Sequence, residues 1–193
     1  MAETRHIEVV ERLAGVLDSL GIAYAIGGSL ASSVYGVMRF TQDADISVQS
    51  FSAVADRFCE AVKDEFYISE QAMRQALESC GSFNLIHFET SFKIDLFVLG
   101  PEGFGRRVLA RRRNARLSDA GGAELAVVSP EDVVLLKLRW FKETDCTSER
   151  QWDDVLGVLA VQEKLLDFGY LTASAQELGL SELLDRAIAA AET

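Results

Sequence analysis

The feature that most constrains the fold is a stretch in which a glycine turn and two aspartates separate two apolar runs. The first run, residues 22–26, ends at Gly27 and Gly28, and the second begins beside Asp43 and Asp45. Glycines let a backbone approach an anion closely, and the first amide groups of a following helix point at it. Residues two apart in a strand share a face, so the two aspartates can bind one hard cation together. The stretch therefore predicts a strand, a turn, a short helix and a second strand, with an anion site beside a cation site.

Composition places the chain among globular proteins of one domain, or of one domain with a small appendage. Of its 193 residues, 49% are hydrophobic and 9% aromatic, which is enough for a sizeable core. Charged residues interrupt the N-terminal segment, so a signal peptide is not expected, and no apolar run approaches the length of a membrane span. The three cysteines are odd in number and far apart, as in reduced thiols. We expect a cytoplasmic protein.

The net charge of −11 argues against nonspecific binding to nucleic acid over the whole surface. One segment is the exception, because the residues from Arg106 to Arg116 include six arginines and no acid. The favoured interpretation is a solvated helix face with some local pairing to acids. The other is a docking surface for a polyanion, either RNA or a substrate phosphate, in which the acceptor-binding residues would be Arg111, Arg112 and Arg113.

Hydrophobic periodicity predicts alternating helices and strands before about residue 128. The expected helices are at 6–20, 52–65 and 70–79, with a short one at the glycine turn and an arginine-rich one after residue 99. The expected strands are at 22–26 and 44–49, a hairpin of 83–89 with 92–99, and two short strands around Gly121-Gly122.

After residue 128 the sequence predicts helices only. Ser129-Pro130-Glu131-Asp132 combines a serine cap, a proline at the first helical position and acids in the first turn. Helices are expected at about 130–142, 149–161, 170–178 and 181–191, with Ser148 and Ser181 as caps. The predicted fold class is α/β (α+β), with a mixed, mainly antiparallel sheet flanked by helices. The predicted domains are residues 1–128 and a helical region, residues 129–193.

A third aspartate lies in the middle of an apolar strand. In residues 92–98, apolar side chains share one face, whereas Asp95 lies on the other with Lys93 and Phe97. A buried carboxylate is costly unless it is paired or bound to a metal. An ion pair with a nearby Arg or Lys is one explanation. Because the aspartate pair above already predicts a cation, we favour a role for Asp95 as a metal ligand or as the base for an attacking hydroxyl.

Together, the glycine turn, the short helix, the Asp-x-Asp pair and the lone aspartate resemble the nucleotidyltransferase-fold superfamily, relatives of DNA polymerase β. The resemblance implies that the triphosphate of a nucleotide is held by Gly27, Gly28 and Ser29. It also implies that two Mg²⁺ ions, or Mn²⁺ in their place, are carried by the catalytic carboxylates of Asp43, Asp45 and Asp95.

The second half is similar to the AbiEii-like toxin branch and its small bacterial relatives. The similarity lies in the helix start at Ser129, in Lys137, and in Arg150 with Asp153-Asp154. It implies that Lys137 contacts phosphate and that Asp153 or Asp154 completes the nucleotide-binding site. Other roles are open on the residues alone. Lys137 can extend to water from an apolar helix side, and one aspartate can pair with Arg150.

These expectations describe a metal-dependent nucleotidyltransferase that moves a nucleoside monophosphate from an NTP such as ATP to a hydroxyl. The acceptor would be an RNA, a protein side chain or a small molecule such as an aminoglycoside. The toxin-like resemblance favours tRNA or protein, with a cognate antitoxin as a partner. The alternative is a non-catalytic nucleotide-binding or regulatory protein, although the complete carboxylate set argues against it. A hydrolase or phosphotransferase with the same metal site is a third possibility.

Overall fold

The computed structural model describes residues 2–118 and 121–191. In these residues seven strands form one mixed sheet in the order β3-β4-β5-β2-β1-β7-β6. The strands are β1 (Tyr24–Ile26), β2 (Asp43–Gln49), β3 (Phe66–Ile68), β4 (Ser82–His87), β5 (Lys93–Leu99), β6 (Arg113–Ala115) and β7 (Leu125–Val127). Only the β2–β5 and β1–β7 pairs are parallel among the described strands. The predicted mixed, mainly antiparallel sheet is confirmed.

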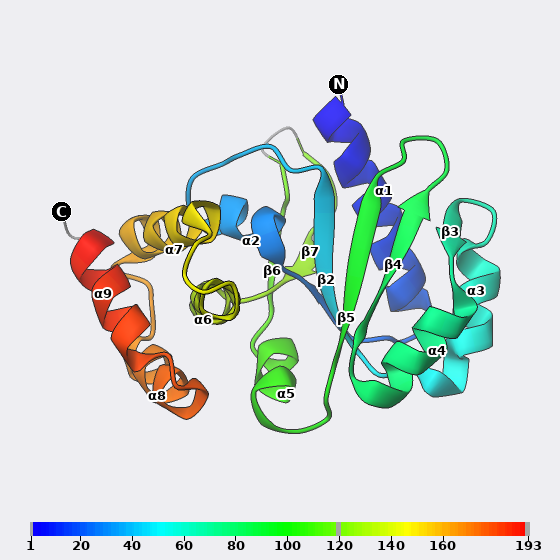
Figure 1. The fold of residues 1–193 in the computed structure, drawn as a ribbon. Helices are drawn as coiled ribbons and strands as arrows, with labels where there is room; N and C mark the ends of the chain where they lie inside the picture. The colour runs from blue at the N-terminus through cyan, green and yellow to red at the C-terminus, as the bar shows by residue number, and fades with distance from the viewer. Residues whose placement is uncertain (1, 119–120, 192–193) are drawn as a thin grey trace.

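Helices flank this sheet and then continue alone. They are α1 (Ala2–Ser19), α2 (Gly28–Tyr35), α3 (Ala55–Val62), α4 (Glu70–Ser79), α5 (Gly103–Ala110), α6 (Pro130–Glu143), α7 (Glu149–Gln162), α8 (Phe168–Leu178) and α9 (Ser181–Ala191). In Figure 1, α2 and α6 lie between the sheet and the group α7 to α9. α6 begins close to the predicted boundary at residue 128, and the division into two domains stays a prediction. None of the described helices has the length and hydropathy needed to cross a membrane.

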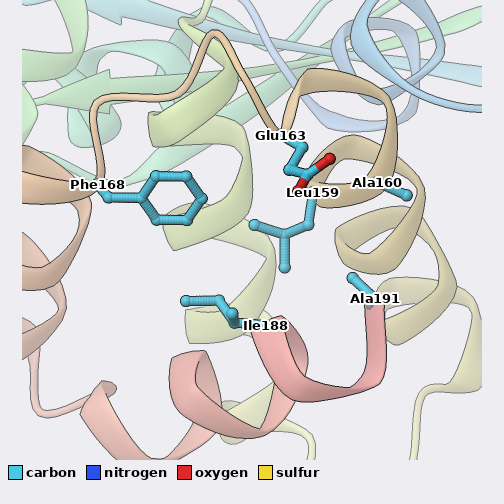
Figure 2. Close-up of a pocket in the computed structure, with 6 residues that line it drawn as sticks. All are labelled: Leu159, Ala160, Glu163, Phe168, Ile188 and Ala191. Carbon is cyan, nitrogen blue, oxygen red and sulfur yellow. The ribbon is translucent and has the colours of Figure 1, made fainter. Parts of the chain in front are cut away.

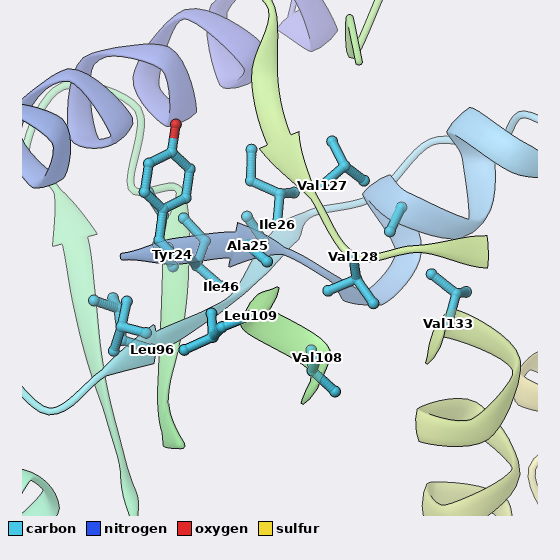
Figure 3. Packing of buried hydrophobic residues seen from close by; sticks show 14 of the residues in the cluster. Tyr24, Ala25, Ile26, Ile46, Leu96, Val108, Leu109, Val127, Val128 and Val133 are labelled. Carbon is cyan, nitrogen blue, oxygen red and sulfur yellow. The ribbon is translucent and has the colours of Figure 1, made fainter. Parts of the chain in front are cut away.

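Alternation along β2 and β5 separates an apolar face from a polar one. Ile46 and Leu96 lie opposite each other in the parallel register, and both are fully buried. Figure 3 shows them packed near Tyr24 of β1 and Leu109 of α5. The intervening residues, at 43, 45, 93 and 95, therefore project from the opposite face of the same two strands. Packing of the apolar face fixes the two strands, and this sets the position of the polar side chains outside the core.

The hairpin and the first C-terminal helix form as predicted. β4 and β5 pair antiparallel, and the backbone of Ser91 adopts φ 55° in the tight connection between them. At the start of α6, the hydroxyl of Ser129 accepts a hydrogen bond from the backbone N–H of Asp132. The other two predicted caps differ, because the side chain of Ser148 makes no capping hydrogen bond and Ser181 lies inside α9.

Two predictions of local structure were wrong. Residues 52–65 form a short 3-10 turn, Ser52–Val54, and then α3, and the edge strand β3 was missed. A strand of three residues is too short for an alternating pattern to reveal it. The segment 106–116 is not one helix: α5 ends at Ala110, and Arg113–Ala115 form β6 paired with β7. Pairing with β7, the next strand along the chain, outweighs the helix propensity of arginine there.

Part of the arginine segment instead stabilises buried acids at the start of α6. Glu131 and Asp132 are fully buried. The guanidinium of Arg111 lies 3.4 Å from a carboxylate oxygen of Glu131 and 3.7 Å from the ring centre of Tyr170 in α8. Arg113 lies 3.3 Å from Glu131, and the hydroxyl of Tyr170 donates to Asp132 at 2.7 Å. This cluster joins β6, α6 and α8.

We expect Arg111→Met to lower the free energy of unfolding by about 2–3 kcal/mol, because it removes a counter-ion from buried carboxylates. The loss stays below that of a fully unpaired buried charge because Arg113 still contacts Glu131. Urea denaturation at neutral pH measures it. The matched control is Arg139→Met, which removes an exposed pair with Glu143 and should cost no more than about 1 kcal/mol. Equal losses for both variants would contradict a structural role of the cluster.

Candidate active site

The turn after β1 brings the backbone against a carboxylate. The N–H of Gly27 donates to the backbone oxygen of Asp45 at 2.8 Å, and Gly28 adopts φ +54°. A Cβ atom added to Gly28 would lie 1.8 Å from Oδ2 of Asp45 and 2.8 Å from its Cβ. No side chain among the described residues caps the N-terminus of α2, so its first amide groups stay available to an anion. Glycine is required here for both conformation and space.

The parallel pairing of β2 with β5 places four charged residues in a compact array. Asp43 lies opposite Lys93, and Asp45 lies opposite Asp95. Partners in neighbouring strands share a face, so the three predicted carboxylates lie together beside one ammonium group. The structure thus brings together the aspartates that the sequence singled out. Their role as metal ligands and catalytic groups stays a prediction.

The electrostatics of this array centre on Asp45. Burial, together with the negative charges of Asp43 and Asp95, raises the pKa of Asp45 to about 6. Lys137 and Lys93 act in the opposite direction. The carboxylates are therefore close enough to repel one another, and the nearby ammonium groups do not fully compensate for them.

Two of the three aspartates already have partners. The ammonium of Lys93 donates to Oδ2 of Asp95 at 2.8 Å, so the ion pair considered for Asp95 exists. Asp43 accepts a hydrogen bond of 2.8 Å from the hydroxyl of Thr41. In the described residues, no group of three or more His, Cys, Asp or Glu side chains is arranged to hold a metal ion. Oxygen donors with excess negative charge nonetheless suit a hard divalent cation, as the raised pKa of Asp45 indicates.

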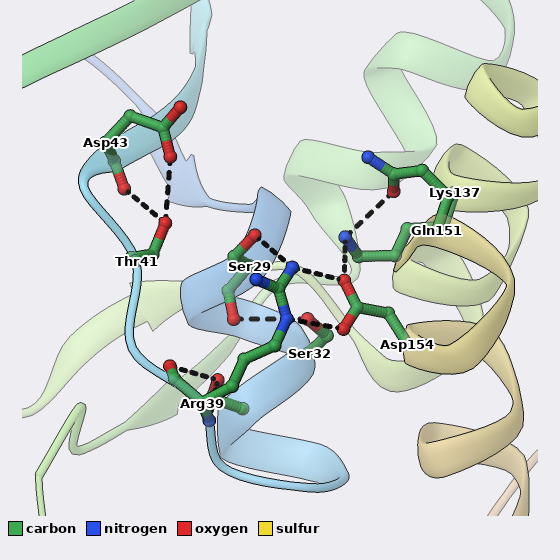
Figure 4. A network of polar contacts seen from close by, with 9 residues as sticks. Ser29, Ser32, Arg39, Thr41, Asp43, Lys137, Gln151 and Asp154 are labelled. Carbon is green, nitrogen blue, oxygen red and sulfur yellow. Dashed lines mark hydrogen bonds and ion pairs between the residues drawn. The ribbon is translucent and has the colours of Figure 1, made fainter. Parts of the chain in front are cut away.

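A second charged network faces the turn from α6 and α7, as Figure 4 shows. Asp154 of α7 accepts two hydrogen bonds from Arg39, both at 2.7 Å, and its Oδ2 lies 2.6 Å from the ammonium of Lys137. Arg39 also donates to the hydroxyl of Ser29 at 2.6 Å. Gln151 accepts from Lys137 at 3.0 Å. The network connects the glycine turn, the loop before β2 and both helices.

Burial and pairing act against each other in this network. Burial lowers the pKa of Lys137, although Asp154 raises it in part. Burial would raise the pKa of Asp154, but hydrogen bonds and charges from Arg39 and Lys137 lower it overall. Asp154 is therefore a stable carboxylate that holds two cations beside the turn.

The contacts in the structure decide between the alternatives that the sequence left open for the lysine on α6 and the two adjacent aspartates on α7. Lys137 does not extend to water, since its side chain is buried and paired. Of the adjacent aspartates, Asp154 faces the turn and pairs with Arg39, whereas Asp153 is exposed. From the sequence, Arg39 could contact substrate or only close the loop, and it was not among the site residues predicted. Its place four residues before Asp43, in the loop between the turn and the Asp-x-Asp pair, was the available signal.

The three arginines predicted to bind an acceptor lie apart from this network in contacts of their own. Arg111 and Arg113 contact the buried Glu131, and Arg112 donates to the backbone oxygen of Leu109. These contacts agree with local pairing to acids, the favoured interpretation of the segment. An acceptor-binding role for the three stays a prediction.

A pocket of about 320 Å³ lies elsewhere, between α7, α8 and α9 (Figure 2). Its lining is mostly apolar: Leu159, Ala160, Glu163, Phe168, Ile188 and Ala191. None of the predicted site residues lines it. We therefore place the candidate active site at the carboxylate array and the glycine turn, where charge and backbone geometry converge.

Comparison with known proteins supports the fold at low sequence identity. No family model and no curated protein matches the sequence. An antigenic nucleotidyltransferase-like protein from Paracoccidioides brasiliensis has 16% identity and a TM-score of 0.58, covering 96% of this chain and 93% of that one. The antibiotic-resistance factor ANT(2'')-Ia has 12% identity and a TM-score of 0.53, covering 98% and 96%. The chain has the nucleotidyltransferase fold. Its placement with AbiEii-like toxins stays a prediction.

Gly28→Ala should lower the free energy of unfolding by about 1–3 kcal/mol, because alanine resists the positive φ and its Cβ displaces the whole side chain of Asp45. Urea denaturation measures the loss. Gly15→Ala is the control: Gly15 lies in α1 with no atom within 4 Å of an added Cβ, so the change should stabilise by about 0.5–1 kcal/mol. If both variants are stabilised, the close contact between Gly28 and the side chain of Asp45 is contradicted.

Asp45→Asn should stabilise the metal-free protein at pH 7 by about 2–3 kcal/mol and have little effect at pH 4. The pKa of Asp45 is raised from 3.8 to about 6 on folding, so the folded state binds more protons between these values. Stability from this group is present below about pH 4 and is lost as the pH rises through about 6. Urea denaturation in EDTA across this range checks the difference. The exposed Asp64→Asn is the control, and a pH-independent difference for Asp45→Asn would contradict the array.

Proposed function

We propose that the protein is a metal-dependent nucleotidyltransferase that transfers a nucleoside monophosphate from an NTP to a hydroxyl. The observation that carries this proposal is the array in which Asp43, Asp45 and Asp95 share one face of β2 and β5. A glycine turn that approaches Asp45 directly stands beside it. Transfer of a nucleotidyl group requires a place for phosphates next to a place for hard cations, and these two features supply both.

The triphosphate would lie over the turn. Gly27, Gly28 and the start of α2 would offer backbone amides, and the hydroxyl of Ser29 would add a donor once Arg39 releases or shares it. Lys137 and Arg39, both held by Asp154, would provide positive charge toward the phosphates. Asp153 is left out of this proposal because its side chain is exposed and outside the network.

In the proposed reaction, the acceptor oxygen forms a bond to the α-phosphorus, and the bond from that phosphorus to the bridging oxygen breaks, releasing pyrophosphate. The proton of the acceptor hydroxyl passes to Asp95, the carboxylate that pairs with Lys93 in the absence of a cation. Divalent cations held by the three aspartates would supply charge neutralisation at the phosphates and the acceptor oxygen. The chain itself contributes positioning, because the register of two strands fixes all three carboxylates.

The acceptor class rests on resemblance. The similarity of the second half to AbiEii-like toxins supports a tRNA or a protein as the acceptor and a cognate antitoxin as a partner. The fold is shared with an antibiotic-resistance factor, ANT(2'')-Ia, which keeps small molecules among the acceptors to be tested. ATP is the first nucleotide to test, together with the other three NTPs.

One observation favours a second candidate function, a non-catalytic nucleotide-binding or regulatory protein. Asp95 is paired with Lys93, and the carboxylates of the described residues are not arranged around a common metal position. A protein that kept only the nucleotide site would need no free third carboxylate. The two functions differ in whether nucleotide is consumed.

The deciding experiment incubates the protein with each of the four α-labelled NTPs and Mg²⁺, against total tRNA, cell extract and an aminoglycoside panel. We expect label transfer with release of pyrophosphate, and its loss by at least about 100-fold in Asp95→Asn, since removing a positioned general base typically costs 10²–10⁴-fold. Nucleotide affinity of that variant should change little. Asp64→Asn, an exposed aspartate after α3, is the matched control and should keep full activity. Nucleotide binding without transfer by the wild type would favour the second function.

A further inference from the structure

We propose that Lys93 is a built-in counter-ion of the carboxylate array, which a divalent cation must displace from Asp95 before the site fills. The inference rests on the proposed function, because it concerns how that site takes up its cation. It assigns a role in cation uptake to a residue that the sequence placed only as a neighbour of Asp95 on the same strand face. Its basis is the position of one ammonium group among three carboxylates.

Strand register makes the position of Lys93 a fixed property of the array. Lys93 and Asp95 lie two residues apart on β5 and therefore on one face. Across the parallel pair, Lys93 lies opposite Asp43, and Asp95 lies opposite Asp45. The four side chains form two rows of two, with a formal charge of three negatives and one positive. A one-residue slip would be needed to remove the ammonium from this face.

The contact itself occupies an atom that a cation would need. Nζ of Lys93 lies 2.8 Å from Oδ2 of Asp95. Oδ2 of Asp45 fills the space beside Gly28 instead, and Asp43 accepts from Thr41 through Oδ1. Asp95 is therefore the carboxylate of the array whose oxygen is held by a positive charge. A divalent cation would have to compete with the ammonium group of Lys93 for Oδ2 of Asp95.

The exposure of the lysine makes displacement feasible, although the side chain of Asp95 is only 22% exposed. The side chain of Lys93 is 48% exposed, so its ammonium can move into water without losing hydration. The pair formed by Lys137 and Asp154 is different, since both side chains are only 6% exposed. A buried pair of that kind is costly to break, whereas an exposed pair contributes little. Lys93 is thus the exchangeable cation of the site, and Lys137 is the permanent one.

Displacement has a consequence for the order of events. While Lys93 is paired, the Oδ2 atom of Asp95 is held by the ammonium and is not available to a cation. Cation entry would take that oxygen and release Lys93 into water, which leaves Oδ1 of Asp95 as the atom that accepts a proton from the acceptor hydroxyl. Lys93 would then raise the cation concentration at which the site fills, and it would keep the empty array less repulsive.

The test measures Mn²⁺ binding to the full chain by isothermal titration calorimetry without nucleotide or acceptor. Lys93→Met should bind Mn²⁺ about two- to fivefold more tightly than the wild type, the range that an exposed ion pair can supply. Lys93→Arg keeps the charge and should bind as the wild type does. Lys63→Met is the matched control, because it removes an exposed lysine paired with Glu60 on α3, away from the array. Thermal unfolding in EDTA confirms that each variant is folded, and Lys93→Gln replaces Lys93→Met if the latter is not.

Two different results would contradict the role of Lys93 and the metal-dependent function separately. If Lys93→Met binds Mn²⁺ with the affinity of the wild type, and Asp45→Asn weakens binding, the metal site stands and the role of Lys93 is wrong. If Asp45→Asn leaves Mn²⁺ binding unchanged, the cation lies elsewhere and the proposed metal-dependent function fails with the inference. Tighter binding by Lys93→Met but not by Lys93→Arg or Lys63→Met supports the inference.

Discussion

The parallel pairing of β2 with β5 is the constraint on which the rest of the site depends. Its register sets Asp45 opposite Asp95, while Ile46 and Leu96, one residue further on, meet in the core. Because side chains alternate along a strand, a one-residue slip would bury carboxylates and expose the apolar pair. Core packing and site geometry are therefore selected by the same register. The hydrophobic effect on one face of the strands holds together charges that repel each other on the other face.

The positive side of the site comes from elements that are remote in sequence. Asp154 on α7 binds Arg39 from the loop before β2, 115 residues away, and also Lys137 on α6. Since this carboxylate is buried between two cations, it fixes the helices against the loop as well as balancing charge. The cluster around Arg111 has a comparable effect at the N-terminal end of α6, where Glu131 is buried. Asp154, paired with Arg39, and Glu131, contacted by Arg111 and Arg113, thus join the helical region to the rest of the fold.

The sequence was sufficient where the fold and the placement of the candidate residues follow from short-range periodicity. Alternation alone placed Asp43 and Asp45 on one face and separated Asp95 from its apolar neighbours. Alternation did not decide whether Asp95 is a metal ligand or a member of an ion pair. The structure shows that Asp95 is paired with Lys93. What could not be predicted depends on long-range contacts. Arg39 gains its partner only when α7 packs beside α2, and the arginine segment ends its helix early because β6 pairs with β7.

The carboxylate array lowers the stability of the folded state, and this loss of stability itself argues for a function at the site. Burial and two neighbouring carboxylates raise the pKa of Asp45 to about 6, so ionisation at neutral pH opposes folding. An asparagine or a serine at this position would satisfy the same turn without the charge. Lys93 and Thr41 lessen the repulsion but do not remove it. Groups arranged against stability in this way are concentrated where a ligand supplies the missing charge, and a divalent cation with a bound triphosphate would do so here.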